Sequence, residues 1–501
     1  MIRLLVRCQI SIQMVIYDHS LFLGVKFMSQ FHNTVSRRDF MKALGVTGVG
    51  LGVASAVGPS FHDLDELAAS QKAGHKLPWY VKQKDTPTAE IDWSAMSRYD
   101  LRKQYNPGAD TEGAEGYPNV AAKWAAEQRA SMIDYAKSGK KGAELKDLGI
   151  ALGSQWGWIH EAHRYYSFFT DSNFPVVLPG GFQTPQEVGI PKHQGSAEEN
   201  ARMIRAAFHY FGAAHVSFQE LDDNTLKLIY ANDSGGRPYV FEDVEQPYAT
   251  PEKYVIPKKC KYVISYLVVQ NLYSNKVGQS WDSYIGGAAV AKAYSELNFL
   301  QGRVMTFVRT LGYTGVGSNP GHVNGFAVLG GQGELGRANI MIHPVYGMVG
   351  RVPNMLLTDL PVPNEKPIDF GAFKFCETCM KCADTCPSGS ISTEKEPSWD
   401  TAGPWNAGGV RTWYANWKTC LPYRNMRYPG LCGNCQGICV FSKLDAASVH
   451  EVVKGVVGTT TIFNGFFRNM DDAFGYNNYD TDDWWNREIP FKYDATSGRW
   501  W

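Results

Sequence analysis

The feature that most constrains this chain of 501 residues is a run of closely spaced cysteines, FCETCMKCADTCPSG, at 375–389. It follows the pattern C-x2-C-x2-C-x3-C-P, in which the fourth cysteine serves a different iron–sulfur cluster from the first three. Four more cysteines follow as C-x11-C-x2-C-x3-C, which completes the ligands of two [4Fe–4S] clusters with crossed ligation. We assign one cluster to Cys376, Cys379, Cys382 and Cys439, and the other to Cys420, Cys432, Cys435 and Cys386.

Two other uses of these cysteines fit the pattern less well. Eight thiolates suffice for two structural zinc sites, but three ligands in one tight run suit a face of a cubane cluster better. A disulfide framework is not expected in a chain of this length with these spacings. The second motif departs from the first because Val440, not proline, follows Cys439. Cys8 and Cys260 remain, and we interpret them as ordinary thiols of the small, often buried kind.

Composition narrows the class of protein. The chain is long enough for two to four structural units. Lys plus Arg and Asp plus Glu both number 49, and this neutral balance gives no sign of nucleic-acid binding. Aromatic residues make up 13% of the chain, which fits either large cores or an apolar pocket for a bulky cofactor.

The N-terminal region carries an export signal. Arg37 and Arg38 precede a Gly/Ala/Val/Leu stretch that closes on an A-x-A pattern at 54–56. This is a twin-arginine signal over 28–56 and not a transmembrane helix, because the apolar run is short and rich in glycine. Since such signals begin a few residues before their arginines, we take Met28 as the true start and 1–27 as a mis-annotated extension. No other run is long enough to span a bilayer.

Hydrophobic periodicity predicts several helices and strands. A helix over 196–212 is indicated by a Ser196–Glu199 capping box, an apolar face and a terminal glycine. A second long helix is expected over 288–311, and Tyr294 lies on its apolar stripe. Strands are expected near 215–221 and over 261–270, with another in the IMIHPVYG segment. Strands that alternate with long helices favour an α/β layer.

Two segments allow more than one interpretation. The glycine-rich stretch at 312–337 could approach a ligand closely, but tight turns between strands are the simpler expectation. It contains G-x-G-x-x-G without the strand, helix and later acidic residue of a dinucleotide fingerprint. The aromatic segment at 153–175 could line a pocket or belong to a core. A proline-rich exit, LLTDLPVPNEKP, leads into the cysteine region.

Taken together, these pieces resemble the catalytic subunit of respiratory corrinoid and iron–sulfur reductive dehalogenases. The resemblance rests on SRRDFMK, AYSELNF…RTLGY, GQGELGR…IHPVYGMVGR, LTDLPVPNEKPIDFG, FCETCMKCADTCPSG and NMDDAFGYN. It implies an α+β or α/β fold with a nitroreductase-like corrinoid-binding core and a C-terminal ferredoxin-like domain. Electrons would pass through the clusters to the corrinoid cobalt, and the enzyme would remove a halogen from an organohalide. The organohalide could be a chlorinated ethene, a chlorinated ethane or a chlorinated aromatic compound.

The resemblance also implies particular residues. The family's proton donor corresponds to Tyr294, its basic neighbour to Arg351 and its substrate-side asparagine to Asn319, with Asn324 as a competitor. Periodicity alone would place Tyr294 in the core. An adjacent guanidinium would stabilise the phenolate that remains when Tyr294 gives up its proton. Ser318, Asn324 and Gly333 are our candidate corrinoid contacts. His322 lacks the Asp of a D-x-H-x-x-G motif, so we expect a structural role for it rather than cobalt ligation.

The expected organisation follows from these assignments. After the signal we expect a loop- and helix-rich region, a corrinoid-binding core with an insertion near 234–259, a ferredoxin-like domain and an aromatic tail; their ranges are 57–210, 211–370, 371–445 and 446–501. The protein is expected on the outer face of the cytoplasmic membrane, with a small integral membrane anchor and an upstream electron donor as partners. Homodimer formation is left open.

Two other classes stay open at this stage. An epoxyqueuosine reductase-like enzyme would share the corrinoid core and the clusters, but an export signal and a neutral charge do not suit an enzyme that modifies tRNA. A corrinoid-free ferredoxin-type electron-transfer protein would leave about three hundred residues ahead of the clusters without a purpose. A corrinoid spectrum from the purified protein distinguishes the second class from both enzymes.

Overall fold

The computed structural model describes residues 77–104, 121–159, 184–277, 283–317, 320–426, 432–443, 449–473, 479–488, 493–494 and 499–500. The predicted signal at 28–56, the extension at 1–27 and Cys8 lie outside these ranges, as does the aromatic segment from residue 160 onward. No helix of the described ranges is long and apolar enough to cross a membrane.

A four-stranded antiparallel sheet forms the centre of the molecule, in the order β2-β6-β10-β7. Its strands are β2 (His215–Glu220), β6 (Tyr262–Val269), β10 (Gly350–Thr358) and β7 (Gly315–Val316). The two strands predicted near 215–221 and over 261–270 are confirmed. The sequence left α+β and α/β folds open and favoured an α/β layer; the structure is α+β, because every neighbouring pair of strands in this sheet is antiparallel.

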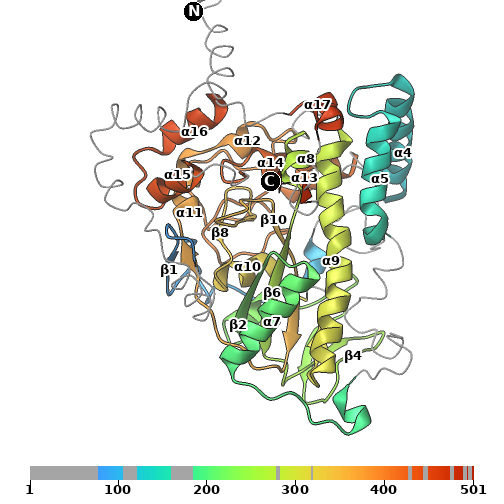
Figure 1. Ribbon diagram of the computed structural model, residues 1–501, viewed down its shortest axis with the longest axis vertical. Helices are drawn as coiled ribbons and strands as arrows, with labels where there is room; N and C mark the ends of the chain where they lie inside the picture. The colour runs from blue at the N-terminus through green and yellow to red at the C-terminus, as the bar shows by residue number, and fades with distance from the viewer. Residues whose placement is uncertain are drawn as a thin grey trace, which may run out of the picture.

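Side chains of β6 alternate between the two faces of the sheet. Ile264, Tyr266 and Val268 pack on one face in an apolar cluster with α7 (Ala197–Phe211) and α9 (Tyr284–Thr310). Leu267 and Val269 pack on the other face with α10 (Val323–Leu329). This period of two explains why the strand reads as continuously apolar, since both of its faces are covered. Figure 1 shows α7 and α9 in front of the sheet.

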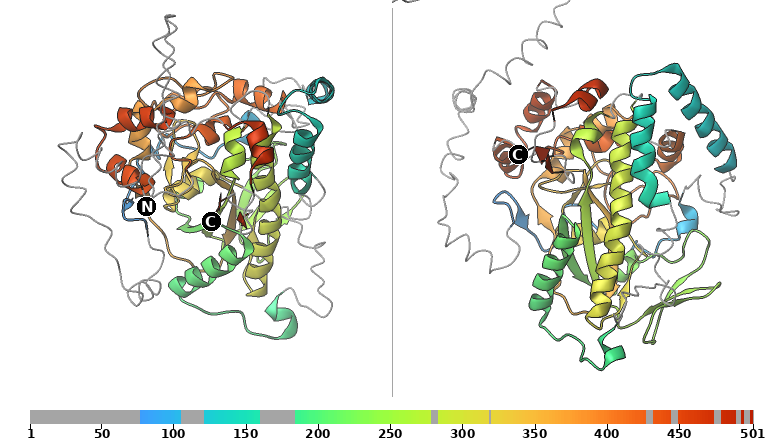
Figure 2. Two further views of the ribbon diagram at one scale, coloured as in Figure 1. Left: turned by 45° about the horizontal axis from the view of Figure 1, so that its top comes forward. Right: turned by 45° about the vertical axis from the view of Figure 1, so that its right-hand side comes forward.

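The two long helices begin and end for identifiable reasons. Ser196 and Glu199 form the predicted capping box of α7, and Gly212 closes the helix with φ of 115°. Helix α9 begins four residues before the expected Ala288, because the Ser283 side chain caps it by accepting from the Ile285 N–H. Both predicted helices are therefore confirmed. Helix α5 (Leu145–Ile159) lies beside α9 in Figure 2, and α4 (Ala121–Ser138) lies on the far side of α5.

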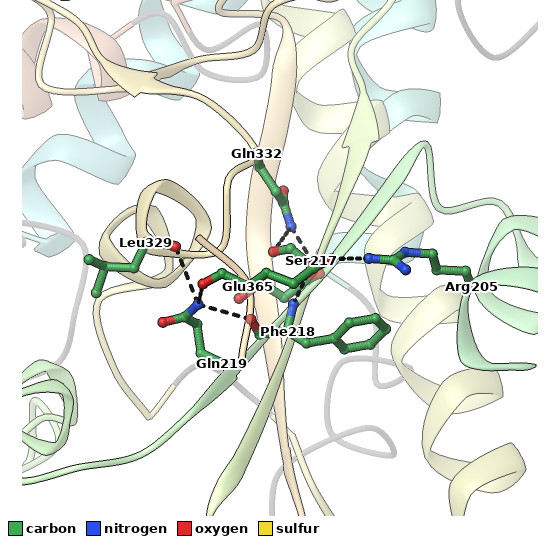
Figure 3. A network of polar contacts seen from close by, with 8 residues as sticks. Arg205, Ser217, Phe218, Gln219, Leu329, Gln332 and Glu365 are labelled. Carbon is green, nitrogen blue, oxygen red and sulfur yellow. Dashed lines mark hydrogen bonds and ion pairs between the residues drawn. The ribbon is translucent and has the colours of Figure 1, made fainter. Parts of the chain in front are cut away.

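A network of polar contacts fastens β2 to its neighbours (Figure 3). The Gln219 amide donates to the carbonyl oxygens of Leu329 and Glu365 at 3.2 and 2.6 Å. Glu365 pairs with Arg205 of α7 and accepts from the Phe218 N–H. The side-chain amide of Gln332 donates to the hydroxyl of Ser217, which lies on β2, at 2.8 Å. Helix α7, the sheet and the chain that leaves it are thus joined through buried hydrogen bonds.

Strand β10, the longest strand among the described residues, was not predicted from the sequence. Its register with β6 shifts between Arg351 and Asn354, and Pro353 lies in this irregularity. Proline cannot donate a ladder hydrogen bond, so a run containing it reads as an exit loop. The strand predicted in IMIHPVYG reduces to β9 (Met341–Ile342), which pairs with β8 (Glu334–Leu335).

The glycine-rich stretch forms turns, as the simpler of the two interpretations predicted, and it also contains the short helix α10. Gly331 has φ of 78°, in the left-handed region that favours glycine. A Cβ on Gly333 would collide with the Ile342 backbone oxygen across the β8–β9 pair. The glycines therefore allow a close approach of backbone to backbone.

The region of the expected insertion forms its own small sheet, in the order β3-β5-β4. Its strands are β3 (Tyr239–Glu242), β4 (Tyr248–Ala249) and β5 (Tyr254–Pro257). Cys260 follows it and is fully buried, and burial raises the pKa of its thiol to about 12. The interpretation of Cys260 as an ordinary buried thiol is confirmed.

The C-terminal part is a set of short helices near the upper end of the sheet in Figure 1. Strand β1 (Lys82–Gln83) pairs with β11 (Ile368–Asp369), which ties the first described residues to the entry of this part. Its elements are α11 (Ala372–Thr378), α12 (Lys381–Asp384), α13 (Trp417–Met426), α14 (Asn434–Ile438), α15 (Val449–Val457), α16 (Asn464–Ala473), α17 (Thr481–Asn486), β12 (Tyr493–Asp494) and β13 (Arg499–Trp500).

Candidate functional site

Short helices position most of the eight motif cysteines. Helix α11 carries Cys376, and Cys379 is its C-cap; α12 carries Cys382. Helix α13 carries Cys420, and α14 carries Cys435 and ends at Cys439. Helices this short gain little from their own hydrogen bonds. Helices α11, α12 and α14 are held in place by packing in one apolar cluster, which includes Phe370, Phe375 and Phe441.

The electrostatic neighbours of the cysteines group four of them as predicted. Burial raises the pKa of Cys376, and the nearby Cys379 and Cys439 raise it further. Burial likewise raises the pKa of Cys382, with Cys376 and Cys439 as its next strongest influences. Cys439, distant in sequence, therefore lies with the first three cysteines of the other motif. We call Cys376, Cys379, Cys382 and Cys439 the first set.

The remaining cysteines form a second set, Cys420, Cys432, Cys435 and Cys386. Burial raises the pKa of Cys420 to about 12, and Cys432 and Cys386 act on it in the same direction. Cys386 is thus near cysteines of the later motif, as crossed ligation requires. Cys435 also acts on Cys382 of the first set. Among the described residues, no three His, Cys, Asp or Glu side chains come together as a site for a single metal ion.

Hydrogen bonds support both sets. The Ser390 N–H donates to the Cys386 sulfur at 3.3 Å, and the Asn434 amide donates to the Thr385 carbonyl at 2.7 Å. The Arg337 guanidinium, 1% exposed, donates to the carbonyl oxygens of Cys376 and Ser392 and stacks over the Trp413 ring. The hydrogen bonds of the Arg337 guanidinium thus go to backbone carbonyls.

A cavity of about 300 Å³ lies between α10, residues 87–104 and residues 405–417. Its lining is mixed, with aromatic rings and several amides. Several cavity-lining residues carry buried polar atoms, and those without a hydrogen-bond partner among the described residues include His322 Nε2, Asn406 Oδ1 and Thr412 Oγ1. Because a buried polar atom without a partner is costly, these atoms indicate a site built for a polar group.

His322 precedes α10 and faces this cavity. Its ring packs against those of Tyr230 and Tyr99, with centroids 4.8 and 5.8 Å away. Burial lowers the pKa of His322 to about 4, so the imidazole is neutral and one ring nitrogen can accept a hydrogen bond. The structural role expected for His322 accounts for its packing but leaves Nε2 unexplained.

The other predicted site residues lie in different parts of the fold. Asn324 lines the cavity, whereas Gly333 lies in the β8–β9 turn and packs against backbone. Tyr294 is half-buried on α9 beside Val290 and Ala291. Arg351 is on β10, where its backbone pairs with Val268. Ser318 and Asn319 lie outside the described residues.

Tyr294 and the backbone of Arg351 are both linked to one apolar cluster. Tyr294 packs against the apolar cluster that contains Val268, and Val268 is the strand partner of Arg351. Other cavity residues, such as Tyr99, Tyr230 and Asn406, could not be recognised from the sequence, because they come from distant segments without a shared motif.

Comparisons with known proteins agree with this arrangement. A model of the reductive dehalogenase subunit family matches residues 76–235. The chloroethene reductive dehalogenase of Dehalococcoides mccartyi (strain VS) is 32% identical over 525 residues, covering 92% of this chain and 98% of that protein. The tetrachloroethene reductive dehalogenase of Sulfurospirillum multivorans is 32% identical over 80% of this chain and 75% of its own.

Solved structures show the same fold. The catabolic reductive dehalogenase NpRdhA superposes with a TM-score of 0.57 at 21% identity, over 82% of this chain. A reductive dehalogenase described with a mechanism for B12-dependent dehalogenation gives 0.57 at 19% identity. This chain spans about half the length of those two solved chains. The chain therefore belongs to the reductive dehalogenase family, and the family predicted from the sequence is confirmed.

Proposed function

We propose that this chain is a corrinoid-dependent reductive dehalogenase that removes a halogen from an organohalide and is fed by two [4Fe–4S] clusters. One observation carries the proposal: helix α13 links the polar cavity to the second set of cysteines. Residues 405–417 line the cavity, Trp417 is the first residue of α13, and Cys420 lies one turn further along that helix. This short path favours the cluster of the second set as the one nearer the cavity.

The cavity residues fit part of a corrinoid. A corrinoid carries amide groups around its ring, and such groups both donate and accept hydrogen bonds. An amide N–H there would satisfy His322 Nε2 or Asn406 Oδ1, and an amide oxygen would accept from the Thr412 hydroxyl. When bound, the corrinoid would supply the cobalt centre that takes electrons from the clusters and cleaves the carbon–halogen bond.

Tyr294 and Arg351 would complete the reaction. Replacing halogen by hydrogen needs a proton, and the Tyr294 hydroxyl is our candidate donor. A free phenol has a pKa of about 10, so it is a weak acid near neutrality. The Arg351 guanidinium would stabilise the phenolate that remains. Asn319 would orient the substrate, and Ser318, Asn324 and Gly333 remain proposed contacts of the corrinoid.

The finer fold assignments are also part of this proposal. An antiparallel sheet with α7 and α9 on one face and α10 on the other supports a nitroreductase-like core over 211–370. Four short helices that carry cysteines support a ferredoxin-like domain over 371–445. Residues 57–210 would precede the core, and the tail at 446–501 would follow the cluster domain.

Export and partners follow from the twin-arginine pattern at 28–56. The enzyme would act on the outer face of the cytoplasmic membrane as terminal reductase of organohalide respiration. A small membrane anchor and an upstream electron donor would be its partners.

Chlorinated ethenes are the first substrates to test, because the relatives are named as reductive dehalogenases of chloroethene, trichloroethene and tetrachloroethene. The experiment is anaerobic turnover of the purified protein with chlorinated ethenes, ethanes and aromatics and a reduced low-potential dye, with halide release as the measurement. We expect halide from at least one chlorinated ethene and a corrinoid spectrum from the extracted protein. A protein with both clusters but no corrinoid and no halide release would be an electron-transfer protein instead.

A further inference from the structure

A buried network of charges surrounds part of the first set of cysteines. Lys381 on α12 and Lys443, four residues after Cys439, both pair with Asp471 of α16. The side chains of Lys381 and Asp471 are each 4% exposed and that of Lys443 is 8% exposed. Lys381 also reaches Asp472 at 2.8 Å, but that carboxylate is half-exposed. The buried part of the network therefore holds two ammonium groups and one carboxylate.

This network acts electrostatically on the first set. Burial raises the pKa of Cys439, and a hydrogen bond from the Phe441 backbone lowers it. Among the charged groups of the network, Lys443 lowers this pKa and Asp471 raises it. Lys381 and Asp471 act on Cys379 in the same two opposite ways. For Cys420 of the second set the named charged neighbours are Cys432, Arg424 and Cys386. The network is thus placed to influence one cluster more than the other.

A third buried lysine lies within reach of the same charges. Lys276, on α8 (Leu272–Val277), is 4% exposed. Burial lowers the pKa of its ammonium group, Lys443 and Lys381 lower it further, and Asp471 and Cys439 act in the opposite direction. The two network lysines and Asp471 thus act in opposite directions on a further charge nearby.

We propose that Lys381, Lys443 and Asp471 set the reduction potential of the cluster held by the first set, with the lysines raising it and Asp471 lowering it. The inference rests on the two-cluster site of the proposed function and deepens it. Reduction adds one negative charge to a cluster, and a buried ammonium group stabilises that charge strongly because little water screens it. Net charge and burial are among the factors that set iron–sulfur potentials.

The two sides of one ion pair therefore make opposite predictions. Lys443→Met removes a positive charge while Asp471 keeps Lys381 as a partner, and the potential of the first-set cluster should fall. Asp471→Asn keeps the shape of the side chain and removes a negative charge, and the same potential should rise. Lys443→Arg keeps the charge and should stay near the unchanged protein.

The measurement is an anaerobic redox titration of the full-length holoprotein, followed by the EPR signals of the two reduced clusters. The signal of the second-set cluster is assigned as the one lost in Cys386→Ser, and it serves as an internal reference. Lys261→Met, which changes an exposed lysine paired with Glu220, is the matched control. We expect opposite shifts for Lys443→Met and Asp471→Asn, confined to the first-set cluster.

Shifts in the same direction, equal shifts of both clusters or no shift at all would overturn the inference. If Lys443→Met does not retain its iron, Asp471→Asn alone tests the inference. The potential of the first-set cluster must then rise in Asp471→Asn for the inference to stand. Iron below the content of two clusters in the unchanged protein would instead contradict the proposed function. A full iron content with unmoved potentials would contradict this inference only.

Discussion

Arg337 and the backbone of Cys376 are joined by two hydrogen bonds to one oxygen. Nε and Nη2 of Arg337 donate to the Cys376 carbonyl at 3.0 and 2.7 Å. Other carbonyls of the 392–395 loop accept from the same guanidinium, so a single buried side chain holds both the first cysteine motif and the loop that follows it. Cys376 also partly offsets the effect of burial on the pKa of Arg337.

Replacing Arg337 should therefore weaken the first cluster selectively. Arg337→Lys keeps the charge but loses the planar fork, which leaves buried carbonyls without donors at a cost of about 2 kcal/mol or more. We expect faster loss of iron from the first set on mild heating, measured by iron content and EPR. Arg411→Lys, at an exposed arginine paired with Glu90, should behave like the unchanged protein. Equal iron retention in both variants would contradict this role.

Crossed ligation can be tested with Cys386. Cys386→Ser should damage the cluster of Cys420, Cys432 and Cys435, because Cys386 lies with the later motif and not with its sequence neighbours. Iron content should fall by up to half, and EPR should retain the signal of the first-set cluster. Loss of that signal instead would mean that Cys386 ligates with Cys376, Cys379 and Cys382.

The stability of the fold should depend on pH through Glu334. Burial raises the pKa of this carboxyl from 4.5 to about 7, even though the N–H groups of Phe370 and Ala372 donate to it and act the other way. The folded protein therefore binds the proton more tightly than the unfolded chain. This stabilisation is complete below the unfolded pKa and is lost as pH rises through about 7.

From about pH 5 to about pH 8, this group should lower the free energy of unfolding by up to about 3 kcal/mol. The measurement is anaerobic denaturant unfolding followed by circular dichroism across that range. Glu334→Gln should flatten the dependence, whereas Glu90→Gln, at an exposed glutamate, should retain it. Parallel curves for the unchanged protein and Glu334→Gln would rule out this carboxyl as the source.

Local patterns allowed parts of this fold to be predicted. The α7 helix and strand β6 were correct because capping residues, apolar spacing and a terminal glycine act within a few residues. Strand β10 was missed because its last residues, 356–358, were assigned to the proline-rich exit, and only the pairing with β6 shows that they belong to the sheet. Sheet direction was also missed, since it depends on partners far apart in the sequence.

The candidate site divides in the same way. Cysteine spacing was enough to propose crossed ligation, because the chemistry fixes which residue types appear and how far apart. The cavity could not be predicted, since its wall combines residues 87–104, α10 and residues 405–417. The lysines of the charge network are likewise ordinary in sequence, and only their burial against Asp471 distinguishes them.

The charge at Arg351 should matter for turnover more than for folding. Arg351→Ala should slow dehalogenation, because the phenolate left at Tyr294 would lose its neighbouring positive charge. Arg351→Lys should be milder, since it keeps the charge and changes only the geometry. Steady-state halide release, with corrinoid and iron content as controls, measures both. Equal activity in Arg351→Ala and the unchanged protein would remove Arg351 from the mechanism.

Tyr294→Phe is the sharpest test of proton donation. The change removes one hydroxyl and keeps the ring that packs against Val290 and Ala291, so the fold should suffer little. If the hydroxyl supplies the proton, the variant should keep corrinoid and both clusters yet lose about 10²–10⁴ in rate, the usual value of general acid catalysis. Tyr313→Phe, at a tyrosine whose hydroxyl bonds the His193 carbonyl, is a matched control and should keep its activity. A Tyr294→Phe enzyme with full cofactor content and near-normal halide release would show that Tyr294 is only a core residue, as its helical spacing alone predicts.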